Sequence, residues 1–209
     1  MKISQTKFLS LALVAVFLSG CGTNRIETSQ AQKNAVPAVA TPVPSPTERE
    51  LDVPYVPTPT EVVDEMLAMA EVKGGDVLYD LGSGDGRIPI TAAKRFGTRG
   101  VGIDIDPERV KDANANAIKE NVANRVTFKE GDIFEEDFSE ATVITLYLLP
   151  EVNMRLRPAL LKLKPGTRIV SHNYDMGSWA PEKTKTLNIG GVDRYVHFWR
   201  VPKDSSTIK

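Results

Sequence analysis

Residues 77–87 read VLYDLGSGDGR, and they say more about the fold than any other part of the sequence. A short apolar run leads into three glycines at alternate positions, Gly82, Gly84 and Gly86. Glycines so placed permit a tight strand-to-helix turn and a close approach of the backbone to a ligand. A dinucleotide-binding loop reads Gly-x-Gly-x-x-Gly, but Arg87 stands where its third glycine would be. Asp80, just before the turn, suits a positively charged ligand group and would repel a pyrophosphate, which disfavours a nicotinamide oxidoreductase.

Apolar runs that fit strands alternate with amphipathic runs that fit helices on both sides of this stretch. Strands are expected at about 76–81, 100–105, 126–129, 142–148 and 168–173, and a final antiparallel pair at 184–189 and 194–201. Helices are expected at about 87–96, from 107 onward, and at 151–163. This alternation predicts an α/β, Rossmann-like, doubly wound and mostly parallel sheet, which binds ligands at the carboxyl ends of its strands.

Two helix starts have local signals. Asp106 followed by Pro107 fits an N-cap and a first helical position. Thr58 or Thr60 can cap an earlier helix, which Gly74-Gly75 would end.

Acidic residues also follow the second and third expected strands. Asp104 comes 24 residues after Asp80, and an acid there can accept hydrogen bonds from both ribose hydroxyls of a nucleoside. Asp132 ends the third strand region. Any one of these acids alone is as well explained by a helix cap or a solvated turn, but together they indicate one site.

The motif acid-x-Gly-x-Gly-x-Gly resembles the first motif of the class I S-adenosylmethionine (SAM)-dependent methyltransferases. The resemblance implies a seven-stranded sheet of the methyltransferase type, with SAM as cofactor. In that family the acid after the third strand meets the adenine amino group, and the next apolar residue packs on the ring. By resemblance the SAM site comprises Asp80, Gly82, Ser83, Gly84, Gly86, Asp104, Ile105, Asp132 and Ile133.

Three further stretches, at residues 53–59, 146–153 and 171–177, resemble a narrower group. This group is the small membrane-associated protein-lysine methyltransferases, including those of the ATP-synthase c-subunit type. The resemblance covers about residues 53–203 and implies a protein substrate, possibly a membrane protein. The (Asp/Asn)-Pro-Pro-(Tyr/Phe) motif of amino-group DNA methyltransferases does not occur after the fourth strand.

Methyl transfer from a sulfonium is a direct displacement, so the enzyme mainly aligns the reacting groups. A lysine acceptor must arrive neutral, and burial in a tight pocket favours this. We expect Tyr147 to line the acceptor pocket as a catalytic-site residue, with Asn153, and with His172 or Asp175, shaping its acceptor side. The alternative for each is ordinary packing or a strand hydrogen bond. Residues Tyr55 and Thr58 are expected to form a lid over the cofactor.

Composition limits the other functions. The 209 residues are 41% apolar and 25% charged, with a net charge of −1, so nucleic acid is not an expected partner. One cysteine and two histidines give no expected metal site. Two functions besides lysine methylation stay open: a small-molecule methyltransferase, and a lipid-anchored, non-catalytic binding module that keeps the SAM fold.

The N-terminus has the character of an export signal. A basic start and an apolar run end in Leu-Ser-Gly-Cys, which resembles the lipobox of bacterial lipoproteins. The predicted organisation is a signal peptide at 1–20, lipidation at Cys21, a disordered Pro/Ala/Thr-rich tether at 21–52, the methyltransferase domain at 53–203 and a tail at 204–209. Such a lipoprotein faces the periplasm, which is in tension with the cytoplasmic origin of SAM.

Overall fold

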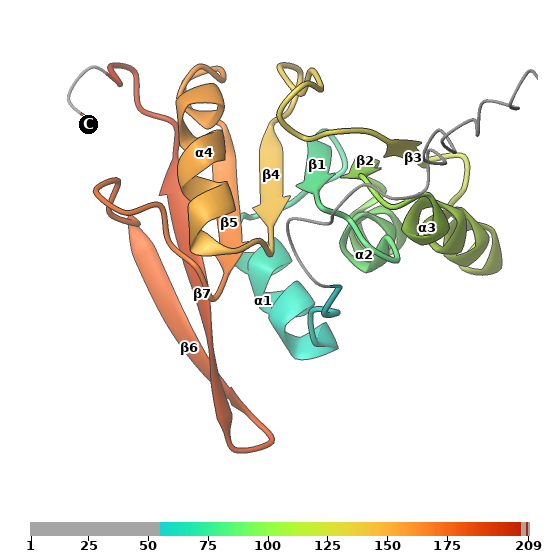
Figure 1. Ribbon diagram of the computed structural model, residues 1–209. Helices are drawn as coiled ribbons and strands as arrows, with labels where there is room; N and C mark the ends of the chain where they lie inside the picture. Colours follow the sequence, from blue (N-terminus) through green and yellow to red (C-terminus); the bar gives the residue numbers. More distant parts are fainter. Residues whose placement is uncertain (1–54, 206–207, 209) are drawn as a thin grey trace, which may run out of the picture. The chain divides into compact units, whose positions relative to one another are not determined.

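The computed structural model describes residues 55–205 and residue 208. The predicted signal peptide, Cys21 and the tether at 21–52 lie outside the described residues. The described chain folds into a seven-stranded sheet with helices on both faces (Figure 1). Its elements are α1 (Thr60–Met69), β1 (Val77–Leu81), α2 (Arg87–Phe96), β2 (Arg99–Asp104), α3 (Pro107–Lys119), β3 (Val126–Glu130), β4 (Val143–Leu146), α4 (Pro150–Leu160), β5 (Arg168–His172), β6 (Lys183–Ile189) and β7 (Val192–Arg200).

The strands lie in the order β3-β2-β1-β4-β5-β7-β6. The pairs from β3 to β5 are parallel, and β7 runs antiparallel to both of its neighbours. The chain moves outward from β1 to β3 and then returns to place β4 beside β1. Such a reversal of direction opens a crevice at the carboxyl ends of the central strands. The predicted α/β class, the mostly parallel sheet and the closing antiparallel pair are confirmed.

Hydrophobic cores form on both faces of the sheet because successive strand residues face opposite sides. Leu78 and Val143 pack against α1 and α2 on one face. Their neighbours Tyr79 and Ile144 belong to the cluster that includes α4 on the other face. The carboxyl edge between these layers is thereby left for the loops that follow the strands.

Local sequence signals predicted some boundaries of helices and strands correctly and others wrongly. Asp106 caps α3 as predicted, since its carboxylate accepts a hydrogen bond from the backbone N–H of Glu108 at 2.9 Å. The expected threonine cap of α1 is wrong: Pro59 occupies the N-cap position without a side-chain cap. β4 ends at Leu146, two residues before its predicted end, so Tyr147 lies in the loop that leads to α4. Within the described residues, no helix has the length and apolar character needed to cross a membrane.

A buried ion pair fixes the edge of the sheet opposite this crevice. The Arg168 guanidinium pairs with the Asp76 carboxylate, and their side chains are 13% and 4% exposed. Arg168 also donates to the carbonyl oxygens of Ala70 at 2.7 Å and Glu71 at 3.0 Å, just after α1. One side chain therefore ties α1 to β5 and neutralises a buried carboxylate.

We expect Arg168→Met to lower the free energy of unfolding by about 3 kcal/mol, because Asp76 would stay buried without its cation. Arg99→Met is the matched control, since the Arg99–Glu140 pair is about half exposed and should contribute at most about 0.5 kcal/mol. Urea denaturation of both variants measures the difference. Equal losses would contradict the special role given to the buried pair.

Candidate functional site

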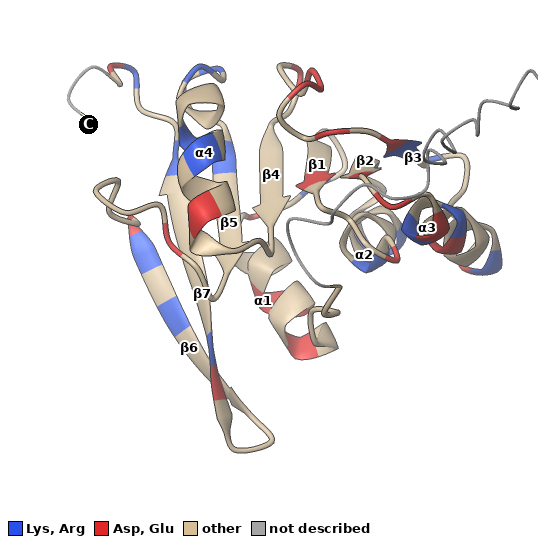
Figure 2. Cartoon of the chain, viewed as in Figure 1, with Lys and Arg blue, Asp and Glu red and all other residues tan. Residues whose placement is uncertain are grey.

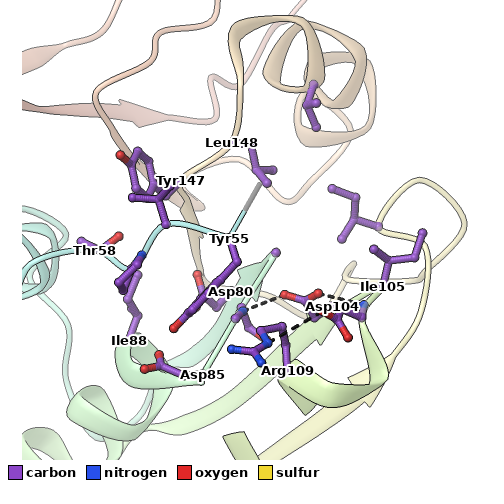
Figure 3. A pocket seen from close by; sticks show the side chains of 18 of the residues that line it. Tyr55, Thr58, Asp80, Asp85, Ile88, Asp104, Ile105, Arg109, Tyr147 and Leu148 are labelled. Carbon is purple, nitrogen blue, oxygen red and sulfur yellow. Dashed lines mark hydrogen bonds and ion pairs between the residues drawn. The ribbon is translucent and has the colours of Figure 1, made fainter. Parts of the chain in front are cut away.

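A pocket opens at the carboxyl edge of the sheet, next to the ends of β1, β2 and β4 (Figure 3). Its walls are the segment 55–58, the glycine loop, the turns after β2 and β3, and the connection from β4 to α4. Eight of the nine predicted cofactor residues line it together: Asp80, Gly82, Ser83, Gly84, Asp104, Ile105, Asp132 and Ile133. The acids and glycines that were predicted from their spacing in the sequence therefore line the same cavity.

The glycine loop is closely covered by two other segments. Gly82 and Gly84 have φ values of +78° and +51°, which L side chains rarely adopt. A Cβ on Gly82 would lie 2.7 Å from Cδ2 of Leu148, and one on Gly84 would lie 2.5 Å from Cε2 of Tyr55. The loop thus requires glycine both for its conformation and for the space above it.

Gly86, the remaining predicted residue, does not line the pocket. It precedes α2 with a φ of +77°, and a Cβ there would lie 2.5 Å from the Phe128 ring. Gly86 therefore allows α2 to pack against the sheet.

Ser83, in the same glycine loop, is 6% exposed, and its hydroxyl has no hydrogen-bond partner within the described residues. The pocket wall therefore holds a buried hydroxyl with free hydrogen-bonding capacity.

We expect Gly84→Ala to weaken the binding of S-adenosylhomocysteine (SAH) by more than about tenfold, because the methyl group would displace the Tyr55 ring. The control is Gly190→Ala in the β6–β7 turn, where φ is +59° and the added Cβ meets nothing within 4 Å. Both substitutions cost about 1 kcal/mol of backbone strain. Calorimetric titration with SAH separates them, and an equal loss of affinity in both would contradict the close fit over Gly84.

Asp80 is a buried carboxylate at the end of β1. It accepts a hydrogen bond from the Thr145 hydroxyl at 2.6 Å, and it pairs with no Lys, Arg or His in the part of the chain described. The pKa of Asp80 is raised to about 7, mainly by burial and in part by the charges of Asp104 and Asp85, against the effect of the Thr145 bond. A positively charged ligand group would stabilise the ionised form.

Asp104 holds the glycine loop in place. Its two carboxylate oxygens accept from the backbone N–H groups of Gly84 at 2.7 Å and Asp106 at 3.0 Å. Burial raises its pKa, although these two hydrogen bonds oppose the shift. Asp132 is arranged similarly after β3, where it accepts from the N–H of Phe134 at 2.9 Å. Each carboxylate keeps lone pairs that can accept from a ligand.

The segment 55–58, which is predicted to form a lid over the cofactor, lies against the glycine loop. Arg87 donates to the Thr58 carbonyl oxygen at 2.8 Å and pairs with Asp85 at 2.6 Å. The Arg109 guanidinium lies 4.8 Å from the centre of the Tyr55 ring, a cation–π contact (Figure 3). The lid is therefore attached to the first residue of α2 and to the first turn of α3.

Aromatic side chains line the end of the pocket at the connection from β4 to α4. Tyr147 and Tyr174 both line it, and their rings are stacked at 17° with centroids 6.3 Å apart. His172 lies behind Tyr147, with a ring-centroid distance of 3.8 Å, and is fully buried. The pKa of His172 is lowered to about 4, mainly by burial and in part by the charge of Arg194. His172 is therefore neutral near pH 7.

Asn153 and Asp175 do not line the pocket. The Asn153 side chain is fully buried in α4 and donates to the carbonyl oxygens of Tyr174 and Asp175, both at 3.3 Å. Asp175 accepts from the N–H of Gly177 within its own turn. Asn153 therefore bears on the pocket only indirectly, by holding the loop that carries Tyr174.

Several lining residues were not predicted from the sequence. They are Val56, Pro57, Asp85, Arg87, Ile88, Asp106, Arg109, Gly131, Phe134, Leu148, Leu149, Val152 and Tyr174. Most are neighbours in sequence of predicted residues. Arg109 had no local signal, because its approach to the lid depends on how α3 packs.

The comparisons with known proteins agree with this geometry. The family model described as the ANTKMT methyltransferase domain matches residues 80–183. The protein-lysine N-methyltransferase of Saccharolobus islandicus is 48% identical over 149 residues, which are 70% of this chain and 92% of that protein. The human lysine N-methyltransferase of the ATP-synthase c-subunit is 32% identical over 162 residues, which are 77% of this chain and 69% of that protein.

A solved structure agrees as well. An RNA methyltransferase from Salinibacter ruber in complex with SAH is 54% identical, with a TM-score of 0.68 over 74% of this chain and 99% of that one. The resemblance stated from residues 77–87 is thereby confirmed in sequence and in fold. The chain belongs to the ANTKMT methyltransferase-domain family of SAM-dependent methyltransferases.

Proposed function

We propose that the chain transfers the methyl group of SAM to the side-chain amine of a protein lysine. The observation that carries the proposal is the layout of the pocket. Figure 3 places Tyr147 and Asp104 at opposite sides of it, with Asp80 between them. An acidic, glycine-lined region for a cationic nucleoside thus adjoins an aromatic region for the acceptor.

The residues of the acidic region fit SAM. Bound SAM supplies a methyl group on a positively charged sulfonium. Asp80 would hold the ammonium group, which gives this buried carboxyl the cation that favours its ionised form. Asp104 would accept from the ribose hydroxyls, as Asp132 would from the adenine amino group, with Ile105 and Ile133 packing on the ring.

The aromatic region suits a lysine amine. An ammonium group must lose its proton before its lone pair can accept a methyl group. Around Tyr147 and Tyr174, the pocket is lined by the apolar Leu148, Leu149 and Val152. Withdrawal from water into such surroundings lowers the pKa of a lysine amine. The ring faces also attract the cation before it deprotonates. The names of the Saccharolobus and human relatives support lysine as the acceptor.

The name of the Salinibacter relative points instead to RNA. The charge of this chain does not favour RNA as the methyl acceptor. Its net charge is −1, and Figure 2 shows basic residues mixed with acidic ones on α3 and acidic residues along the segment after β3. Nucleic-acid-binding proteins draw most of their affinity from basic residues that contact the phosphates, so this mixed charge disfavours RNA. We therefore favour a protein acceptor, with a small molecule or a non-catalytic role as alternatives.

We also propose that the protein is anchored to a membrane through a lipid on Cys21. The lipobox-like Leu-Ser-Gly-Cys at the end of the apolar run supports this proposal. Mass spectrometry of the mature N-terminus tests it. A lipidated Cys21 supports a periplasm-facing lipoprotein near membrane-protein substrates, whereas an unmodified Met1 contradicts it.

Transfer can be tested without knowing the substrate. Purified full-length protein and methyl-tritiated SAM are added to an extract of the producing organism from which the gene has been deleted. Acid hydrolysis and chromatography then identify the labelled product. We expect label in Nε-methylated lysines. Label in nucleosides identifies an RNA methyltransferase, label in small molecules supports that alternative, and no label despite SAH binding supports the non-catalytic module.

A further inference from the structure

One buried contact connects the lid to the acceptor end of the pocket. The Thr58 hydroxyl lies 3.3 Å from Nδ1 of His172, a residue 114 positions later in the chain. Both side chains are buried, at 4% and 0% exposure. Because the Thr58 carbonyl is held by Arg87, this threonine is fixed on one side to the start of α2 and on the other to the end of β5.

The other side of His172 supports an aromatic stack. Its ring centroid is 3.8 Å from that of Tyr147, which in turn stacks on Tyr174. Tyr147 and Tyr174 line the pocket, whereas His172 does not. His172 therefore stands between the lid residue Thr58 and the acceptor-side ring of Tyr147, out of reach of the cofactor and the acceptor.

Packing alone gives no reason for an imidazole at this position. The Nε2 atom of His172 is buried without a hydrogen-bond partner within the described residues. A buried, unpaired nitrogen costs free energy that a phenylalanine or leucine would avoid. The imidazole provides both a ring face for Tyr147 and a hydrogen bond to Thr58, a combination that neither phenylalanine nor leucine offers.

We propose that His172 is a positioning residue that links closure of the cofactor lid to alignment of Tyr147 at the acceptor end. The inference rests on the proposed transfer to lysine. When Thr58 docks on His172, the imidazole is held in one orientation, and Tyr147 is supported by its face. When the lid is open, the hydrogen bond is lost and the ring stack loses its fixed support, so the acceptor is aligned only when the cofactor is covered.

Three variants separate the hydrogen bond to Thr58 from the support of the Tyr147 ring. Thr58→Val and His172→Phe each remove the hydrogen bond, and His172→Phe keeps a ring for Tyr147. His172→Gln keeps a hydrogen-bonding group and removes the ring. We expect Thr58→Val and His172→Phe each to weaken SAH binding about three- to tenfold, and the double variant to lose no more than either single one. His172→Gln should bind SAH nearly as the wild type does.

The rate of transfer at saturating SAM should fall in all three variants, because each removes either the hydrogen bond that orients the imidazole or the ring face that supports Tyr147. We expect each variant to slow labelling of the gene-deleted extract by about tenfold, so that His172→Gln slows transfer while it keeps its affinity for SAH. Additive losses of SAH affinity in the double variant, or a wild-type rate of transfer in Thr58→Val, would overturn the proposal. The SAH titrations need no acceptor, so they test the lid contact even if the chain proves not to methylate lysine. Thr58→Val leaves the sheet untouched and provides the test if a His172 variant does not fold.

Discussion

Asp80→Asn is expected to weaken SAH binding by about 100-fold, because a hydrogen bond to a charged group is worth about 1.5–3 kcal/mol and its loss leaves the ligand ammonium unpaired. The side chain is only 3% exposed at the end of β1, so little water can replace the lost carboxylate. Asparagine keeps the shape and the hydrogen bond with Thr145. Calorimetric titration with SAH measures the loss, and a circular dichroism melt checks that the variant is folded.

The pH dependence gives this prediction a second measurement. Because burial raises the pKa of Asp80 to about 7, SAH binding to the wild type should weaken by roughly tenfold for each pH unit below 7. The free protein behaves oppositely: the folded pKa exceeds the reference value of 3.8, so the contribution of Asp80 to stability falls as the pH rises from about 4 to about 7. Asp80→Asn should remove both dependences. Unchanged SAH affinity in this variant would show that the ammonium group binds elsewhere.

Tyr147→Ala is expected to slow methyl transfer on the order of 100-fold while leaving SAH affinity within about threefold of the wild type. The ring lines the pocket beyond the glycine loop, in contact with His172 and Tyr174, so its removal widens the acceptor region without touching the acidic region. Single-turnover labelling of the extract at saturating SAM measures the rate.

The matched variant is Tyr147→Phe, which keeps the ring and loses only the hydroxyl. A nearly normal rate in Tyr147→Phe assigns the effect to the ring face, whereas an equal loss in both variants assigns it to the hydroxyl. A Tyr147→Ala enzyme that transfers at the wild-type rate would contradict the placement of the acceptor at this end of the pocket.

The cofactor region could be predicted because its signals are local. The loop from Gly82 to Gly86 and the acids Asp80 and Asp104 stand directly after apolar strands, and parallel strands bring their carboxyl ends to one edge of the sheet. The positions of the strands could also be predicted, because the apolar runs that mark them are local signals too. Only Gly86 differs, because its close contact is with the core residue Phe128 and not with the pocket.

The acceptor end and the lid contacts depend on packing between distant segments, which periodicity does not encode. The Asn153 side chain points into the protein because of the orientation of α4, and its amide holds the loop of Tyr174. The bonds of Arg87 and His172 to Thr58 join positions 29 and 114 residues apart. Propensity also failed at the start of α1, where Thr58 makes this tertiary bond and caps no helix.

A crystal structure of the full-length protein with SAH would show directly where the cofactor binds. We predict the SAH ammonium within hydrogen-bonding distance of Asp80, the ribose hydroxyls on Asp104, and the adenine between Ile105 and Ile133. We also predict that the sulfur faces the rings of Tyr147 and Tyr174. SAH bound outside this pocket, or bound within it with its sulfur turned away from Tyr147, would contradict this placement of the two substrates.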